Sequence, residues 1–251
     1  MKPTIIDKLK TIENEHKIDI LFAVESGSRA WGFPSTDSDY DVRFIYKRRV
    51  EDYLKINEID DFIDFEIENE LDFKAWDIQK VLRLMLKSNA SILEYLQSPI
   101  HYIINEAFEK ELFDLAESQF NPQKVARHYL GITTRKLIEI EHSNKLNLKN
   151  LFYALRSVLA AKWIIEEKTL PPMEFKKLDY LIKNESVSAK IKDYLKLKHT
   201  VDESFLTSKD TELINWIIEL NENLKSKTEF LPKIEFDKKR IDDFFLKIIG
   251  A

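Results

Sequence analysis

The sequence of 251 residues has no cysteine, only 4 glycines and only 7 prolines. The missing cysteines exclude disulfide bonds, thiolate zinc sites and cysteine nucleophiles. So few glycines and prolines leave few backbone breaks, which favours helix. The patterns GxGxxG, GxxxxGK[ST] and GxSxG are also missing, which argues against Rossmann, P-loop and α/β-hydrolase proteins. Because no apolar run approaches the ~20 residues of a membrane-spanning helix, we expect a cytoplasmic protein with no membrane partner.

The residues that are present indicate a packed protein with an uneven charge. Hydrophobic residues make up 44% of the chain, with 16 Phe and 9 Tyr, which argues against disorder. Residues 1–120 hold 15 Lys and Arg against 25 Asp and Glu, whereas residues 121–200 hold 16 against 8. Such an imbalance is typical of a solvated face. The functional alternative is an acidic, metal-binding half and a basic half that receives phosphates.

Hydrophobic periodicity predicts the elements of the first half of the chain. Ile, Leu and charged residues at helical spacing predict a helix over 3–17, and the apolar run 18–26 predicts a buried strand. The small and polar residues of 27–38 predict a loop with at most one helical turn. Alternation over 64–73 predicts another strand, after which a helical period begins at Ala75.

The segment 39–48 follows the loop and alternates polar with apolar side chains, as a strand does. Asp39, Asp41 and Arg43 share one face, while Tyr40, Val42 and Phe44 share the other. The strand predicted over 64–73 also has one acidic face, made of Asp64, Glu66, Glu68, Glu70 and Asp72.

Helical patterns dominate after residue 102, and residues 232–251 give no firm assignment. Helices are expected over 103–119, 122–143, 148–168, 174–183, 187–199 and 209–226. The predicted fold class is therefore α+β, with a small mixed sheet, helices behind it and an all-helical second half. The expected domains are a catalytic α/β domain over 1–100 and a helical domain over 101–251.

The segment from Glu25 to Arg43 carries the chemistry. Its Gly27-Ser28 turn lets the backbone approach a ligand, and free N–H groups at such a turn attract anions. Asp39 and Asp41, two positions apart on a strand, project from one face and repel each other unless a cation lies between them. Oxygen ligands of this kind suit Mg²⁺ or Mn²⁺. An anion-binding turn beside such a metal site is typical of a nucleoside triphosphate site.

Each of these signals has a plainer interpretation. Asp-x-Asp is common on exposed strands, so specificity comes from the conjunction of strand, Gly-Ser turn, short loop and Asp-x-Asp-x-Arg. Arg29 is a candidate contact of the triphosphate, and Arg43 either binds it or pairs with the neighbouring acids. Lys149, Tyr153 and Arg156 share one helix face, which either holds phosphates and a base or is solvated.

GSRAWG (27–32) and SDYDVRFIY (38–46) resemble the signature of the DNA polymerase β-like nucleotidyltransferase superfamily. The similarity is greatest to its stand-alone bacterial branch linked to RNA repair. AWDIQKVLRLMLKSNASILEYLQSP (75–99), KNLFYALRSVLAAKWI (149–164) and PPMEF (171–175) are similar to later segments of that branch. The resemblance covers roughly residues 20–180.

The resemblance implies a mixed sheet with a helical second half that closes a nucleotide cleft. It also implies attack of a hydroxyl on the α-phosphate of an NTP, with pyrophosphate leaving. The family's Gly-Ser falls on Gly27 and Ser28, and its metal pair on Asp39 and Asp41. We choose Asp72 as the third carboxylate because it precedes the Trp76-Asp77 helix start, and two metal ions are expected. Glu70 and Glu66 remain alternatives, since a register slip of two residues would exchange them.

These observations together predict an Mg²⁺-dependent nucleotidyltransferase. Asp39, Asp41 and Asp72 are the catalytic and metal-binding candidates. The expected acceptor is an RNA end, although a protein side chain or a small molecule fits the donor chemistry equally, and ATP is one of four possible donors. The alternative is a module that binds NTPs without transferring them. The nucleotide-binding candidates are Gly27, Ser28, Arg29, Arg43, Lys149, Tyr153 and Arg156.

Overall fold

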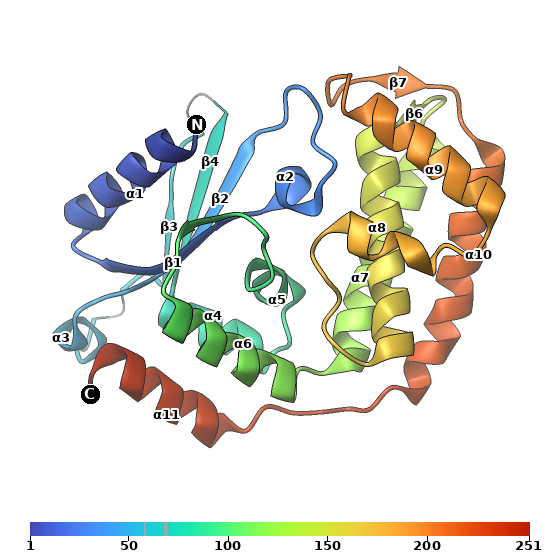
Figure 1. Ribbon diagram of the computed structural model, residues 1–251. Helices are drawn as coiled ribbons and strands as arrows, with labels where there is room; N and C mark the ends of the chain where they lie inside the picture. The colour runs from blue at the N-terminus through green and yellow to red at the C-terminus, as the bar shows by residue number, and fades with distance from the viewer. Residues whose placement is uncertain (58, 68–69) are drawn as a thin grey trace. The chain divides into compact units, whose positions relative to one another are not determined.

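The computed structural model describes residues 1–57, 59–67 and 70–251. Its packing divides the chain into two compact units (Figure 1). The first, here called the sheet unit, comprises Met1–Gly27, Asp39–Phe120 and Glu235–Ala251. The second, the helical unit, comprises Ser28–Ser38 and Asn121–Ile234. These units are not the same segments as the predicted domains 1–100 and 101–251.

The sheet unit is built on five strands in the order β3-β4-β2-β1-β5. Strands β2 and β4 are parallel, and the other neighbours are antiparallel. The mixed sheet of an α+β fold, predicted from the sequence, is confirmed. The strands are β1 (Asp19–Glu25), β2 (Tyr40–Lys47), β3 (Phe62–Asp64), β4 (Leu71–Asp77) and β5 (His101–Ile103).

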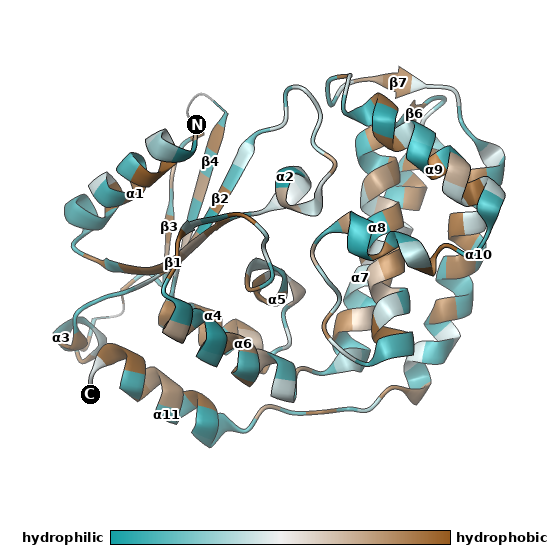
Figure 2. Ribbon diagram, viewed as in Figure 1, coloured by the Kyte–Doolittle hydropathy of each residue, from teal (hydrophilic) through white to brown (hydrophobic). Residues whose placement is uncertain are grey.

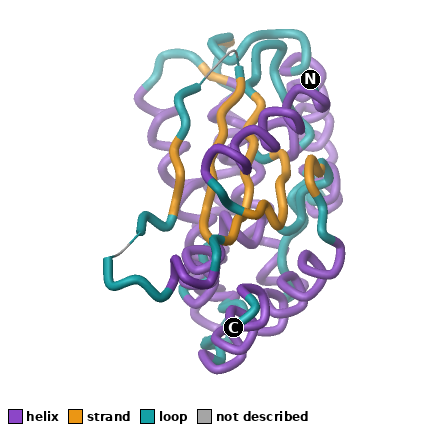
Figure 3. Tube along the Cα trace, turned by 90° about the vertical axis from the view of Figure 1, so that its left-hand side faces the viewer, coloured by secondary structure: helices purple, strands orange, loops and turns teal. Residues whose placement is uncertain are grey.

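Helix α1 (Lys2–His16) covers one face of the sheet, and the candidate site lies on the opposite face. Ile5, Leu9 and Ile12 lie at helical spacing and are buried in one cluster with Val42, Phe44 and other residues of the same strand parity. Figure 3 shows α1 crossing in front of the strands, and Figure 2 shows the hydrophobic residues along β1. Because side chains alternate along a strand, the polar residues of β2 face away from α1.

The remaining helices of the sheet unit follow from short amphipathic segments and side-chain caps. Asp77, Asn89 and Asn105 each accept a backbone N–H at a helix start. Phe108 packs on Phe244 with ring centroids 6.1 Å apart. The two helices that carry these rings, α6 beyond residue 100 and the C-terminal α11, both belong to the sheet unit. The helices are α3 (Val50–Tyr53), α4 (Ile78–Leu86), α5 (Ala90–Tyr95), α6 (Glu106–Gln119) and α11 (Lys238–Ile249).

One strand prediction is wrong in its limits. The alternation over 64–73 does not form one strand, because β3 ends at Asp64 and β4 begins at Leu71. Glu70 has a left-handed φ of 67°, which an extended strand cannot contain. The helix predicted from Ala75 begins only at Ile78, since β4 continues to Asp77.

The helical unit contains four long helices. They are α7 (Pro122–His142), α8 (Leu148–Glu167), α9 (Glu185–Lys198) and α10 (Thr211–Lys227). The largely buried α8 packs on α7 and α10. The segment predicted as a helix over 174–183 forms two 3-10 turns, Phe175–Lys177 and Asp179–Leu181, and a third spans Thr228–Phe230. Two short strands, β6 (Leu146–Asn147) and β7 (Leu206–Thr207), interrupt the helices. Among the described residues, no helix is both long and apolar enough to span a membrane.

Candidate active site

The chain turns sharply at Gly27, directly after β1. Gly27 has a φ of 61°, in the left-handed region that glycine adopts without steric cost. A β-carbon built on Gly27 would lie 2.0 Å from Oδ2 and 2.9 Å from Cγ of Asp41. The turn and the Asp41 carboxylate therefore share a space in which only glycine fits.

Two carboxylates lie side by side where the parallel strands β2 and β4 begin. Asp41 is the register partner of Asp72, and their side chains are 28% and 13% exposed. Asp39 lies just before β2 and is exposed, and its charge acts on Asp41. All three residues fall in the sheet unit, and Asp41 and Asp72 project from the sheet face opposite α1.

Arg43 joins the two strand carboxylates. Its Nη2 donates to Oδ1 of Asp41 and to Oδ2 of Asp72, each at 2.7 Å, and its Nη1 donates to the carbonyl oxygen of Asp72 at 2.7 Å. The charge of the guanidinium also acts on the hydroxyl of Tyr95. Of the two roles that the sequence left open for Arg43, these contacts are those of an internal ion pair.

Burial and like charges set the protonation of this cluster. Burial raises the pKa of Asp41 above its usual value, Asp72 and Asp39 raise it further, and Arg43 opposes the rise. Burial also raises the pKa of Tyr95 to about 12 against the effect of Arg43, so Tyr95 carries a neutral hydroxyl near neutral pH. Burial is the largest cause of the net rise at Asp41, and Arg43 is the largest effect that opposes it.

The donor set fits a hard divalent cation. Mg²⁺ and Mn²⁺ prefer carboxylate oxygens, and a cation here would relieve the repulsion of Asp41 by Asp72 and Asp39. Within the described part of the chain, no three or more His, Asp or Glu side chains are arranged as a metal site. Arg43 instead contacts both Asp41 and Asp72. The residue types fit a metal, while the described arrangement is that of an arginine-neutralised pair.

The alternatives for the third carboxylate lie outside β4. Glu70 is exposed at the turn before the strand, where its carbonyl oxygen accepts the N–H of Tyr40 at 2.7 Å. Glu66 is exposed in the connection after β3, and Glu68 lies outside the described residues. Of the described candidates, Asp72 is the one in register with Asp41.

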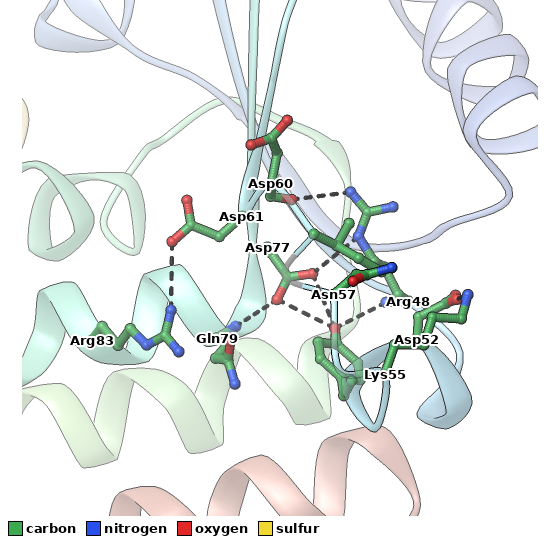
Figure 4. A pocket seen from close by; sticks show the side chains of 11 residues that line it. Arg48, Asp52, Lys55, Asn57, Asp60, Asp61, Asp77, Gln79 and Arg83 are labelled. Atoms are coloured by element: carbon green, nitrogen blue, oxygen red, sulfur yellow. Dashed lines mark hydrogen bonds and ion pairs between the residues drawn. The ribbon is translucent and has the colours of Figure 1, made fainter.

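Another buried acid, Asp77, ends β4. Its Oδ1 accepts the backbone N–H of Gln79 at 2.8 Å and so caps helix α4. The Tyr53 hydroxyl donates to Asp77 Oδ2 at 3.1 Å, and Arg48 Nε lies 3.8 Å from that oxygen. These residues line a polar pocket of about 480 Å³ (Figure 4). Because Asp41 lies at the opposite end of the parallel strand pair, this pocket is separate from the carboxylate pair.

Ser28 and Arg29 fall in the helical unit. The carbonyl oxygen of Ser28 accepts the N–H of Phe33 at 3.0 Å, and Nη2 of Arg29 donates to the carbonyl oxygen of Ser38 at 2.6 Å. The ring of Phe33 packs on that of Phe152 with centroids 5.3 Å apart. The described contacts of Arg29 therefore close the loop that follows the Gly-Ser turn.

The predicted face of α8 is engaged within the same unit. Lys149 pairs with Glu203, and the ring of Tyr153 meets that of Trp31 edge-on at 4.8 Å between centroids. Arg156 is 2% exposed, and its guanidinium carbon lies 4.6 Å from the centroid of the Trp31 ring. In the described structure Arg156 is thus an internal residue and not an exposed phosphate clamp, because aromatic rings cover it.

No sequence pattern pointed to the residues at and after the end of α9 that hold the loop 28–38. Buried Lys198 donates from Nζ to Oγ of Ser35 at 2.7 Å, and Ser38 Oγ donates to Glu203 Oε1 at 3.0 Å. Burial lowers the pKa of Lys198. These partners lie more than 160 residues apart, so no local pattern could pair them.

In the sheet unit, the sequence did not identify Glu25 as a functional candidate. Glu25 ends the apolar run of β1 and is 1% exposed, and its Oε1 accepts the backbone N–H of Asp41 at 2.8 Å. The available signal was an acidic residue at the end of a buried strand, since such residues are rarely buried without partners.

The match to a family model agrees with the motif-based resemblance. A model of the family described as "RlaP: RNA repair pathway DNA polymerase beta family" matches residues 1–247. The uncharacterized protein YcgL of Bacillus subtilis (strain 168) is 39% identical over 220 residues, which is 87% of this chain and 84% of that protein. The crystal structure of a nucleotidyltransferase-like protein from Exiguobacterium sibiricum 255-15 aligns with 98% of this chain and 80% of its own, at 13% identity and a TM-score of 0.30.

Proposed function

The chain belongs to the RNA repair pathway DNA polymerase beta family, and on this premise we propose that it is an Mg²⁺-dependent nucleotidyltransferase. It would transfer the NMP part of an NTP to an acceptor hydroxyl and release pyrophosphate. The observation that carries the proposal is the pair of carboxylates, Asp41 and Asp72, in register on parallel strands beside a glycine turn that touches one of them.

The proposed reaction assigns separate roles to the carboxylates. Asp39, Asp41 and Asp72 would hold the divalent metal, which supplies charge neutralisation for the triphosphate when bound. The acceptor oxygen attacks the α-phosphorus, the bond from that phosphorus to the bridging oxygen breaks, and pyrophosphate leaves. Asp72 would help to take the proton from the acceptor hydroxyl. Arg43 would keep the strand carboxylates oriented through its two 2.7 Å contacts.

The nucleotide-binding roles differ in their support. Gly27, Ser28 and Arg29 at the turn, with Lys149, remain the proposed triphosphate contacts, and the Lys149 side chain is 42% exposed. Arg43 is proposed as an ion-pair partner because its guanidinium contacts both Asp41 and Asp72. Tyr153 and Arg156 contact Trp31, which favours a packing role for both.

Pyrophosphate release from each of the four NTPs in the presence of RNA ends tests the proposal. Asp39→Ala combined with Asp41→Ala should abolish release, and Asp41→Ala alone should lower the rate by about 10³-fold or more. Asp64→Ala is the matched control, because Asp64 is an exposed aspartate at the end of β3 in the same sheet. Release that persists in the double variant would refute the assignment.

A module that binds NTPs without transferring them is the second candidate, since it would use the same carboxylates and turn. This function would be favoured if Mg-NTP raises the Tm while no pyrophosphate is released from any of the four NTPs, with or without added cell extract.

The acceptor and the location are the finer parts of the proposal. The description of the family favours an RNA end as acceptor, and a cytoplasmic location is proposed with it. Incubation with each NTP labelled at the α-phosphate and with total cell extract would identify the labelled molecule. Label on RNA supports an RNA acceptor, whereas label on protein or on a small molecule contradicts it.

A further inference from the structure

Glu25 is a carboxylate placed where an acid is costly. It ends β1 and is 1% exposed, and burial of a carboxylate is unfavourable unless hydrogen bonds compensate it. Its two oxygens have different partners: Oε1 accepts the N–H of Asp41 at 2.8 Å, and Oε2 accepts the hydroxyl of Tyr102. The side chain of Glu25 thereby connects Asp41 of the candidate site with Tyr102 of β5.

The bond to Asp41 replaces a bond that the strand ladder cannot make. The register of β1 with β2 reaches Glu25 and Val42, and the N–H of Ser26 donates to the carbonyl oxygen of Asp41 at 2.8 Å. The N–H of Asp41 donates to the Glu25 carboxylate, because the chain turns away at Gly27. The backbone N–H and the carbonyl oxygen of Asp41 are thus both hydrogen-bonded to residues at the end of β1.

The backbone of Glu25 is fixed as firmly as its side chain. Its N–H donates to the carbonyl oxygen of Ile100 at 2.9 Å, and its carbonyl oxygen accepts the hydroxyl of Ser98 at 2.6 Å. Together with Tyr102, these residues use each polar group of Glu25. A side chain held at so many points can position a neighbour accurately, because it has little freedom to move.

We infer that Glu25 is a positioning residue of the candidate site and that Tyr102 orients it. Glu25 fixes the place of Asp41 through the hydrogen bond that it accepts from the Asp41 backbone N–H. The inference rests on the proposed function. Residues that orient metal ligands in this way typically change metal affinity or activity by about 10–100-fold when they are replaced.

Glu25→Gln is the main test because it keeps the shape but replaces one of the two accepting oxygens by an NH₂ group, which cannot accept a hydrogen bond. Mn²⁺ binding is measured by electron paramagnetic resonance, and the Mg²⁺ midpoint, kcat and KM for NTP by pyrophosphate release. We expect Mn²⁺ affinity to fall about 10-fold and the Mg²⁺ midpoint to rise similarly, while KM for NTP at saturating Mg²⁺ stays unchanged. Asp77→Asn is the matched control, since Asp77 is 2% exposed and should change the Tm without changing the metal midpoint.

Tyr102→Phe carries the same test if Glu25→Gln does not fold, because it removes one hydroxyl from a residue that is 9% exposed. A rise of about 3-fold in the metal midpoint, smaller than the range for a direct orienting group, would support the inference. Equal Mn²⁺ affinity in the wild type and in the variants would overturn the positioning role of Glu25 and leave the proposed function standing. A wild-type protein that neither binds Mn²⁺ nor releases pyrophosphate would overturn the proposed function and this role with it.

Discussion

Gly27→Ala tests the contact between the turn and Asp41 most directly. The substitution adds a single methyl group, at a position where the backbone has a φ of 61°. That methyl carbon would lie 2.0 Å from Oδ2 of Asp41, far inside the contact distance of about 3.5 Å between non-bonded heavy atoms. Either the turn or the carboxylate has to move.

Two costs add in this variant. The left-handed conformation destabilises the folded state by about 1–2 kcal/mol when an L-residue adopts it. Overpacking of a close contact destabilises the folded state by about 1–3 kcal/mol. The carboxylate cannot withdraw freely, because Arg43 Nη2 holds Oδ1 of Asp41 at 2.7 Å. We therefore expect unfolding free energy to fall by about 2–5 kcal/mol. A displacement of about 1 Å at a reacting centre can cost about 10²-fold in rate, so the rate of pyrophosphate release should also fall.

The other glycines supply controls of the same size. Gly32 has a φ of 87° and no atom of the described residues within 4 Å of a built β-carbon, so Gly32→Ala should show the conformational cost alone. Gly131 lies inside α7, also with open space around it, and Gly131→Ala should stabilise the helix by about 0.5–1 kcal/mol.

Chemical denaturation of the three variants gives the comparison. Gly27→Ala should be the least stable, and Asp41→Ala in the same chain should restore the steric part of its loss, because the clash partner is then gone. Equal losses in Gly27→Ala and Gly32→Ala, or no recovery in the double variant, would refute the steric reasoning.

Further predictions follow from burial and charge. Arg156→Ala should lower the unfolding free energy by about 3 kcal/mol, because it removes a buried guanidinium that contacts Trp31 and donates to the Met173 carbonyl oxygen. Lys149→Ala should lower the unfolding free energy by about 1 kcal/mol or less, since its ion pair with Glu203 is partly exposed. Equal losses of unfolding free energy in Arg156→Ala and Lys149→Ala, measured by chemical denaturation, would contradict this contrast. The raised pKa of Asp41 means that the folded state binds its proton more tightly than the unfolded state does. Stability is therefore lost as pH rises from the usual carboxyl pKa through the raised one. Calorimetry across that range should show the Tm of Asp41→Asn gaining on that of the wild type as pH rises, and a gap that is constant with pH would contradict the assignment.

Local patterns were sufficient for the elements whose periodicity is strong. The helix at the N-terminus, β1 and β2 lie within two residues of their predicted limits. Helical spacing, a short apolar run and strict alternation, respectively, were each enough to identify the element. The cap formed by Asp77 was also predictable, since capping depends on residues a few positions apart. The polarity of the segment 64–73 was misleading, because alternation alone does not reveal a left-handed residue such as Glu70.

The sequence by itself determined the residue types of the candidate site and the face of β2 from which Asp41 and Arg43 project. Only the tertiary structure decided which partners they have. Strand pairing set Asp72 opposite Asp41, and the turn brought Gly27 against the carboxylate. Burial and aromatic contacts made Arg156 internal. Contacts between residues distant in sequence depend on how the elements pack, and periodicity along one element carries no information about them.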